Sequence, residues 1–344
     1  MNSRGLVRAV LHGAATPRPV CGPLSVHFCA VHAGVPIRNY TLDANKLAGS
    51  VVAYWETFRP DAVWVSSDTW ITAEAMGAAT AFVDENSPMA GIGGPAVRSR
   101  ADIDRLPPPD PTRQGRQPVM LDALRRVCAA LGHEAFVVGC FDQSPFSLAC
   151  AVAGVETVMT ATMTDPEFVE ALLDRCAEYV IAYGQAMAAC GPDMLSTGDS
   201  PAIMLGPAVY RSVALPWEQR VFRTLRATTE CALSLHICGD ATAILPDMAR
   251  AGADVLEVDH ALDLERACAV VPDAVALWGN LDPVGLLYHG SPDDVAAACE
   301  TALDTVRRMG RARFVLSSGC TLAPGTPREN VHALVQSVHT AAKA

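Results

Sequence analysis

Hydrophobic positions along the chain fall into short apolar runs that alternate with longer stretches of helical periodicity. Eight runs end in a polar residue, a glycine or a cysteine, as parallel strands buried on both faces do: 19–28, 62–68, 135–140, 193–199, 232–240, 255–259, 274–280 and 313–320. The stretches 165–190 and 291–309 are spaced as amphipathic helices, and Ser291 with the acids after it suits a helix start. Eight strand–helix units without a linker predict one α/β domain over residues 1–344, a (β/α)8 or TIM barrel.

Two segments depart from this alternation. Residues 1–18 predict an amphipathic helical extension, because an Arg and a His interrupt what would otherwise be the apolar core of a signal peptide. Residues 84–118 are rich in Gly, Pro and charge, and we expect a long loop insertion over the barrel mouth rather than a disordered linker. A doubly wound sheet is the alternative fold, but no G-x-G-x-x-G or phosphate-binding loop follows the first run.

Composition narrows the class of protein. Half of the 344 residues are hydrophobic, yet no apolar run reaches the roughly 18 residues of a membrane span. The net charge of −11 and the lack of a basic run argue against binding nucleic acid or an anionic membrane. Twelve cysteines in a large chain with no signal peptide predict reduced thiols, most of them buried as small apolar side chains. These features predict a cytoplasmic enzyme.

Candidate chemistry gathers where the predicted strands end, because the active site of a barrel is built at the carboxyl ends of its strands. Those ends supply Asp68, Cys140, Asp199, His236, Cys238, Asp259, Asn280 and Cys320. His236 and Cys238 alternate along one strand, so both can point the same way. Together with Cys320 they form a reasonable catalytic zinc set, with three protein ligands and an open fourth position.

Each of these residues also has a structural reading. A single Cys among twelve is more often a buried filler than a ligand. A carboxylate at a strand end often only caps the next helix or accepts loop amides. His260 follows the sixth strand and could reach the mouth, although a lone His is more often structural.

Three C-terminal motifs carry a family resemblance. "HICGDATAILPDM", "LWGNLDPVGLLYHGSPDDV" and "FVLSSGCTLAPGTPRENVHALV" resemble the uroporphyrinogen decarboxylase superfamily, whose fold is a single TIM barrel. The chain looks most like the zinc methyltransferase branch, the methylcobalamin:coenzyme M methyltransferases and their relatives. The similarity continues through 68–78 and 198–216, and so covers most of the chain.

The resemblance implies that His236, Cys238 and Cys320 bind zinc. Zinc would hold a small-molecule thiol as a thiolate, which attacks a methyl donor such as a methylated corrinoid. No corrinoid-binding D-x-H-x-x-G occurs in the chain, so a corrinoid would arrive free or on a separate protein. The resemblance also implies that the protein is a monomer or a homodimer.

The resemblance also suggests roles for residues around the metal. Asp199 is expected to orient substrate or receive a proton, with Asp68 and Glu74 as further catalytic candidates; for Glu74 a structural place at a helix start is the alternative. A neutral wall of Met, Phe and Cys suggests a small, fairly apolar substrate. The expected substrate-binding residues are Asn280, Cys140, Phe141 and His27.

Two other classes of function stay open. A decarboxylase-like lyase on a small carboxylated substrate is the alternative enzyme. Against it, "VCGPLSVHFCAVHAG" lacks the arginines by which decarboxylases hold their substrate, and the last strand ends in Gly319-Cys320 instead of Gly-His-Gly. A non-catalytic zinc protein is the third class, and it would need a closed set of four ligands.

Overall fold

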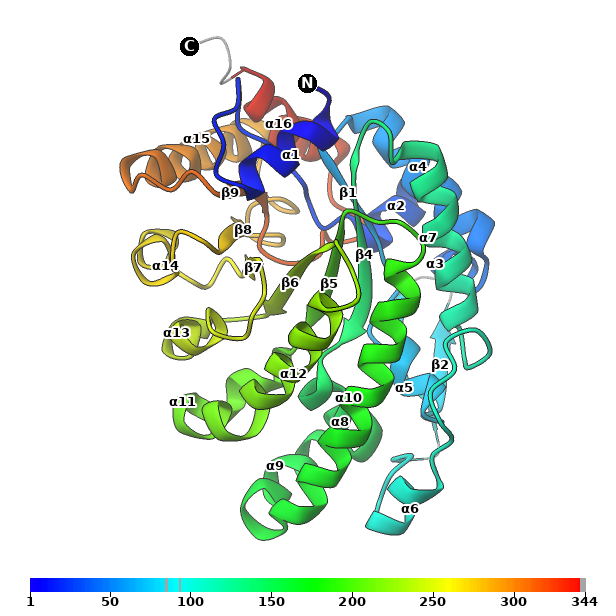
Figure 1. Cartoon of the computed structure of the whole chain (residues 1–344). Helices are drawn as coiled ribbons and strands as arrows, with labels where there is room; N and C mark the ends of the chain where they lie inside the picture. The colour runs from blue at the N-terminus through cyan, green and yellow to red at the C-terminus, as the bar shows by residue number, and fades with distance from the viewer. Residues whose placement is uncertain (84–85, 93, 341–344) are drawn as a thin grey trace.

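Seven parallel strands form a curled sheet at the centre of the protein. The structure is a computed structural model, and it describes residues 1–83, 86–92 and 94–340. The strands lie in chain order: β1 (Ala62–Val65), β4 (Phe136–Gln143), β5 (Met194–Gly198), β6 (Ala232–Ile237), β7 (Val255–Val258), β8 (Ala276–Leu281) and β9 (Phe314–Ser318). Helices surround this sheet (Figure 1). The predicted TIM-barrel fold is confirmed.

The eighth position of the barrel is filled by a short extended segment, residues 20–22. Gly22 N donates to Leu316 O and Leu316 N donates to Val20 O, each at 3.0 Å, which joins the segment to β9. Asp61 N donates to Cys21 O at 2.9 Å, which joins it to the start of β1. The prediction of a full strand over 19–28 is therefore wrong. Its second half folds as helix α2 (Val26–His32).

The helices alternate with the strands as the periodicity predicts. They are α1 (Ser3–Leu11), α2, α3 (Ile37–Leu42), α4 (Ala44–Phe58), α5 (Ile71–Ala75), α6 (Arg100–Arg105), α7 (Gln117–Leu131), α8 (Pro145–Ala153), α9 (Val155–Thr164), α10 (Pro166–Ala188), α11 (Gly206–Val209), α12 (Leu215–Arg226), α13 (Leu245–Met248), α14 (Leu264–Val270), α15 (Pro292–Arg308) and α16 (Arg328–Thr340). The helices predicted over 165–190 and 291–309 correspond to α10 and α15. A capping box of Ser291 and Asp294 starts α15.

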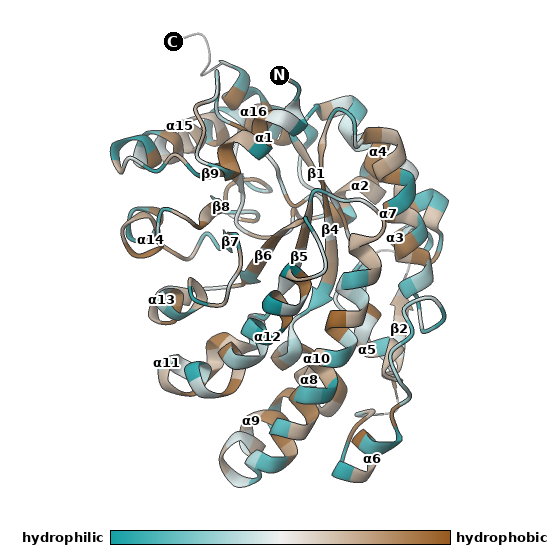
Figure 2. Cartoon of the chain, viewed as in Figure 1, coloured by the Kyte–Doolittle hydropathy of each residue, from teal (hydrophilic) through white to brown (hydrophobic). Residues whose placement is uncertain are grey.

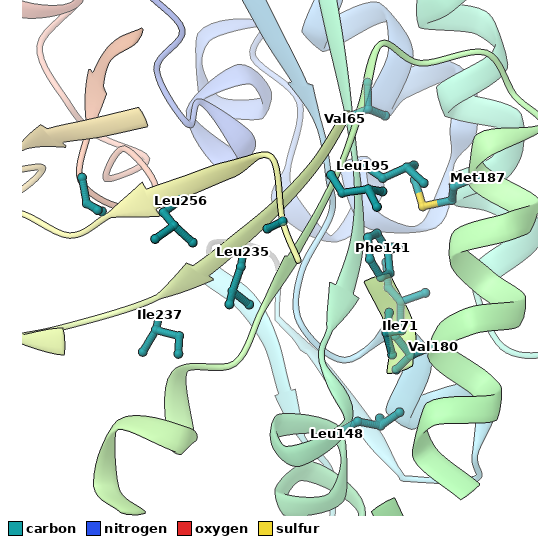
Figure 3. Close-up of a cluster of buried hydrophobic side chains, with 14 of the residues drawn as sticks. Val65, Ile71, Phe141, Leu148, Val180, Met187, Leu195, Leu235, Ile237 and Leu256 are labelled. Carbon is teal, nitrogen blue, oxygen red and sulfur yellow. The ribbon is translucent and has the colours of Figure 1, made fainter. Parts of the chain in front are cut away.

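Alternation along each strand separates two cores. Figure 2 shows the apolar strands at the centre of the fold. The residues that face outward pack against the helices, among them Val65, Phe141, Leu195, Leu235 and Leu256 (Figure 3). The residues that face inward are apolar near the amino ends of the strands, where Trp64, Phe136 and Trp278 meet. Towards the carboxyl ends the inward positions become polar, which marks that end as the place for chemistry.

The N-terminal extension closes the amino end of the barrel. Helix α1 packs Leu6, Val7 and Val10 onto the inner apolar cluster. Asp193, which is buried, accepts hydrogen bonds from Arg4 Nε at 2.8 Å and Arg8 Nε at 3.0 Å. These charged hydrogen bonds fix the helix across the amino ends of the strands, so within the described residues this end of the barrel is covered.

The segment 84–118 contains more secondary structure than a loop. Strand β3 (Asn86–Ala90) pairs with β2 (Thr80–Val83) in an antiparallel hairpin, α6 follows, and α7 begins inside the segment. Residues 84, 85 and 93 lie outside the described residues. Within the described ranges no single helix is long and apolar enough to cross a membrane, and α8 with α9 reaches that length only across a bend of 110°.

Candidate metal centre at the barrel mouth

Three soft side chains converge at the carboxyl ends of β6 and β9. His236 is the inward-facing residue before the end of β6, Cys238 follows that strand, and Cys320 lies two residues beyond β9. Their ligand atoms all lie within 4.8 Å of one another. His236 Nε2 is 2.9 Å from Cys238 Sγ, which is 3.7 Å from Cys320 Sγ. The residues that the sequence indicated as metal ligands are thus brought together.

The spacing of the two sulfur atoms fits a tetrahedral zinc ion. Two Zn–S bonds of about 2.3 Å at a tetrahedral angle place their sulfur atoms about 3.8 Å apart, and Cys238 and Cys320 are separated by 3.7 Å. A Zn–N bond would set the nitrogen about 3.6 Å from each sulfur, so the ring of His236 must move back by roughly 0.7 Å. One nitrogen and two thiolates are a donor set that selects zinc over hard cations such as magnesium.

Backbone contacts hold the metal-binding side chains in place. His236 Nδ1 lies 3.0 Å from Glu257 O, so the proton on Nδ1 is donated to this carbonyl and the Nε2 lone pair faces the sulfur atoms. Cys238 N donates to Ser200 Oγ at 3.3 Å. The ligand that depends on a defined tautomer is therefore already oriented.

The hydrogen bond between the two thiols shifts their pKa values in opposite directions. The pKa of Cys238 is lowered, chiefly by its hydrogen bond with Cys320. The same hydrogen bond, together with burial, raises the pKa of Cys320 to about 12. Burial lowers the pKa of His236, but the hydrogen bond and charge of Cys320 outweigh this effect and bring the pKa to about 9.

Glu257 is a polar residue of the barrel interior that sequence reasoning missed. It pairs in register with His236 on the neighbouring strand, and its Oε1 accepts hydrogen bonds from Ser196 Oγ and Ser234 Oγ. Burial raises the pKa of this carboxyl group. The sequence did carry one signal for it, an acid inside the apolar run "VLEV". A carboxylate buried in a strand needs hydrogen-bond partners from neighbouring strands.

Asp68 and Glu74 are both engaged by a residue that the sequence did not single out, Arg116. Its Nη1 lies 2.5 Å from Asp68 Oδ2, its Nη2 lies 3.0 Å from Asp68 Oδ1, and its Nε lies 2.6 Å from Glu74 Oε2. Ser67 Oγ and Trp70 N also donate to Asp68. These two carboxylates hold the end of the 84–118 segment against β1, and so they are not free groups at the metal.

Asp199 points away from the metal ligands. Ser196 and Gly198 occupy the inward positions of β5, so alternation turns Asp199 outward, where it is fully buried. Its Oδ1 accepts hydrogen bonds from N and Oγ of Ser147, both at 2.7 Å. Burial raises the pKa of Asp199 and that of its neighbour Glu218. Asp199 thus lies among buried residues, and its expected role toward substrate stays a prediction.

The four expected substrate-binding residues separate into different environments. Cys140 faces the interior, and burial raises the pKa of its thiol to about 12. Phe141 faces the opposite way and packs on α10 beside Val180 and Met187 (Figure 3), and its expected role in substrate binding stays a prediction. Asn280 Nδ2 donates to Leu262 O at 2.8 Å, and so holds the connection after β7. Burial lowers the pKa of His27, whose Nε2 has no partner among the described residues.

Comparison with known proteins shows to which family the chain belongs. The family model "Uroporphyrinogen decarboxylase (URO-D)" matches residues 2–341. The chain belongs to the uroporphyrinogen decarboxylase family. This agrees with the resemblance found in the C-terminal motifs.

Members of the family with two different activities are similar to the chain. It is 31% identical over 290 residues to a uroporphyrinogen decarboxylase of Synechococcus sp. (strain CC9902), which covers 82% of this chain and 79% of the relative. It is also 31% identical over 296 residues to the methylcobamide:CoM methyltransferase MtbA of Methanosarcina mazei, covering 86% and 84%. A methyltransferase structure from Methanosarcina mazei superposes with a TM-score of 0.86 at 25% identity over 99% of both chains. The two methyltransferase matches support the methyltransferase branch of the family.

Proposed function

We propose that this protein is a zinc-dependent methyltransferase that transfers a methyl group to a small-molecule thiol. The observation that carries the proposal is the group formed by His236, Cys238 and Cys320, whose sulfur atoms are separated by 3.7 Å, as tetrahedral zinc requires. Three protein ligands leave one position for a substrate. Zinc, when bound, keeps the sulfur of a thiol substrate deprotonated and nucleophilic at neutral pH.

The residues of the chain prepare this site before substrate arrives. The carbonyl of Glu257 fixes the tautomer of His236, and Ser200 holds the backbone of Cys238. The apolar lower half of the barrel, closed by α1, excludes water from below. A thiol can therefore approach only from the mouth, with its sulfur directed toward the ligand group.

The methyl donor in this proposal is a methylated corrinoid, delivered by a separate corrinoid protein. Support comes from the relative MtbA, a methylcobamide:CoM methyltransferase. Exposed apolar side chains also occur on connections that follow the carboxyl ends of strands, at Met89, Val155, Met163, Met204 and Val284. The twelve free thiols suit a reducing compartment such as the cytoplasm.

The decarboxylase-like alternative receives less support from the site. A departing carboxylate needs a cation that is free to bind it. The buried Arg116 already uses Nε, Nη1 and Nη2 on Glu74 and Asp68. The methyltransferase proposal requires no such cation.

The test is the metal content of protein purified without an affinity tag, measured by plasma mass spectrometry. We expect about one zinc ion per chain in the wild type, and loss of that zinc in Cys320→Ser. Cys140→Ser is the matched control, because Cys140 is also an inward-facing thiol near a strand end but lies outside the ligand group. It should retain its zinc.

Activity is then followed as loss of the methylcobalamin absorbance in the presence of 2-mercaptoethanol. Chelation should abolish the transfer and added zinc should restore it, whereas Cys320→Ser should stay inactive in both conditions. A wild-type protein that is well folded but free of zinc would refute the proposal. Transfer that continues after zinc is removed would refute it equally.

A further inference from the structure

The two sulfur atoms of the metal-binding group are also close enough to react with each other. Cys238 Sγ and Cys320 Sγ lie 3.7 Å apart, which is a contact between sulfur atoms that are not bonded. A disulfide bond measures about 2.05 Å, so a bond requires these two atoms to approach by roughly 1.7 Å. The approach is short enough to be shared between rotation of the two side chains and a small shift of the loops that carry them.

Both cysteines lie beyond the hydrogen-bonded part of the sheet. The pairing of β6 with β7 ends at Ile237, one residue before Cys238, and the pairing of β8 with β9 ends at Ser318, two residues before Cys320. The backbone N of Cys238 donates to a side chain, Ser200 Oγ, instead of a neighbouring strand. The two sulfur atoms can therefore approach each other without breaking any pairing between strands.

This pair differs from the other cysteines of the chain. All twelve thiols are free and lie within the described residues, and among them only Cys238 and Cys320 are joined by a sulfur–sulfur contact. Seven of the others are buried, out of reach of an oxidant in solution. Cys128, Cys140 and Cys231 are partly exposed, as the pair is, but have no thiol partner among the described residues. Only at the metal-binding group are two thiols both accessible and adjacent.

We propose that Cys238 and Cys320 form a reversible disulfide when hydrogen peroxide oxidises the site. One of the two thiols, as its thiolate, attacks a peroxide oxygen. The O–O bond breaks, the sulfur becomes a sulfenic acid, and the departing hydroxide takes up the thiol proton as water. The second thiol then attacks the sulfenic sulfur, so the S–S bond forms, the S–O bond breaks and a second water leaves. Two thiols and one peroxide thus give one disulfide and two waters, with two electrons passing from sulfur to oxygen.

The neighbouring thiol decides the fate of the first oxidation product. A sulfenic acid that has no thiol partner is oxidised further to sulfinic acid, which thiols do not reduce. Here the second sulfur is already 3.7 Å away, so the disulfide forms without the arrival of another molecule. Oxidation therefore stops at a stage that a dithiol reverses, and the ligand atoms are protected from permanent loss.

The disulfide and the metal exclude each other, because they use the same two sulfur atoms. The metal is bound by thiolate sulfur, and a sulfur atom in a disulfide no longer carries that negative charge. Oxidation therefore leaves His236 as the only remaining ligand of the group, so zinc is released. This coupling to zinc rests on the proposed function, whereas formation of the bond in metal-free protein does not. Peroxide is thus expected to stop methyl transfer until the bond is reduced.

The experiment locates the bond by peptide mass. Metal-free protein, prepared with a chelator, receives an equimolar amount of hydrogen peroxide, is alkylated, and is digested with trypsin without reduction. Trypsin places Cys238 in peptide 227–250 and Cys320 in peptide 314–328, since each peptide follows an arginine and ends with one. The wild type should show these two peptides joined, and dithiothreitol should separate them. Titration of the unfolded protein should show the loss of two of its twelve free thiols.

Peptide 227–250 also contains Cys231, which provides the matched control. Cys231 is partly exposed as well, but it precedes β6 and so lies at the opposite end of that strand from Cys238. Cys231→Ser should therefore keep the joined peptides, whereas Cys238→Ser should lose them. In Cys320→Ser the remaining thiol has no partner, so Cys238 should appear as sulfinic acid, which dithiothreitol does not reduce.

Zinc-loaded protein is oxidised in the same way, and a chromogenic chelator reports the zinc that is set free. About one zinc ion should leave for each disulfide formed, and dithiothreitol with added zinc should restore the metal content. Zinc that stays bound to the oxidised form would overturn the coupling between the bond and the metal.

The remaining outcomes separate this inference from the proposed function. Metal-free wild type that yields no joined peptides after oxidation would overturn the disulfide, and this readout does not depend on the folding of any variant. Joined peptides that persist in Cys238→Ser would overturn it as well, because the bond would then use Cys231. Joined peptides in a wild type that binds no zinc would refute the proposed function and leave the disulfide standing.

Discussion

Removing Arg116 is the perturbation whose cost the structure specifies best. Arg116→Met keeps most of the aliphatic volume but removes the cation that contacts Asp68 at 2.5 and 3.0 Å and Glu74 at 2.6 Å. The side chains of Arg116 and Asp68 are 5% and 0% exposed. Breaking one partner of a buried ion pair costs about 3–5 kcal/mol, because the other charge is left without compensation. Glu74 is 23% exposed and adds little, since water still reaches it.

We therefore expect Arg116→Met to lower the free energy of unfolding by about 4 kcal/mol, most of it from Asp68. For a chain of 344 residues, an unfolding entropy of roughly 2.1 cal/mol/K per residue converts this loss into a fall in Tm of about 6 °C. Urea denaturation is followed by tryptophan fluorescence, to which Trp64 and Trp278 in the barrel core contribute.

Two further variants make the measurement decisive. The triple change of Arg116→Met with Asp68→Asn and Glu74→Gln removes all three charges, and should recover at least half of the loss. Arg100→Met breaks a surface pair with Asp104, 63% and 68% exposed, and should cost less than about 0.5 kcal/mol. A loss below about 1 kcal/mol for Arg116→Met, or no recovery in the triple variant, would refute the reasoning.

Two other predictions concern pH and helix capping. Burial raises the pKa of Asp142 to about 8. Between about pH 4 and 8 the native state therefore retains a proton that the unfolded state has released, and the wild type loses stability as the pH rises. Asp142→Asn should flatten this dependence in urea denaturation series, and an unchanged slope would contradict it. Ser291→Ala removes the capping box of α15 and should cost about 1 kcal/mol by thermal unfolding, whereas Glu300→Ala on the same helix should stay within about 0.5 kcal/mol.

The metal-binding group could be predicted because it depends on local rules. Alternation along a strand places His236 and Cys238 on one side, and the barrel places Cys320 near them. Both rules hold wherever a regular strand runs to its end. The same reasoning identified α10 and α15 from apolar spacing.

The candidate residues whose placement the sequence did not indicate lie where a strand ends or bulges, or depend on contacts between distant segments. Asp199 follows the last residue of β5, so its side chain turns outward to Ser147. Phe141 lies on the outward face of a strand that bulges before Gln143. Arg116 was missed because its two partners are 48 and 42 positions away in the chain. No pattern within a single segment indicates a contact of that kind.

The pairing of residues 20–22 with β9 closes the barrel, and it bears on the order in which the chain folds. It joins Gly22 to Leu316 across almost the whole sequence, whereas every other pair of neighbouring strands in the barrel is formed by segments that follow one another. Closing so long a loop costs more chain entropy than pairing two strands that are close in sequence, and this short segment gains few hydrogen bonds in return. The seven-stranded sheet can therefore form first, and the N-terminal segment then completes the ring as a latch. Since α1 and α16 lie on the same side of the molecule (Figure 1), a circular permutant that links these two helices would make this latch a local contact.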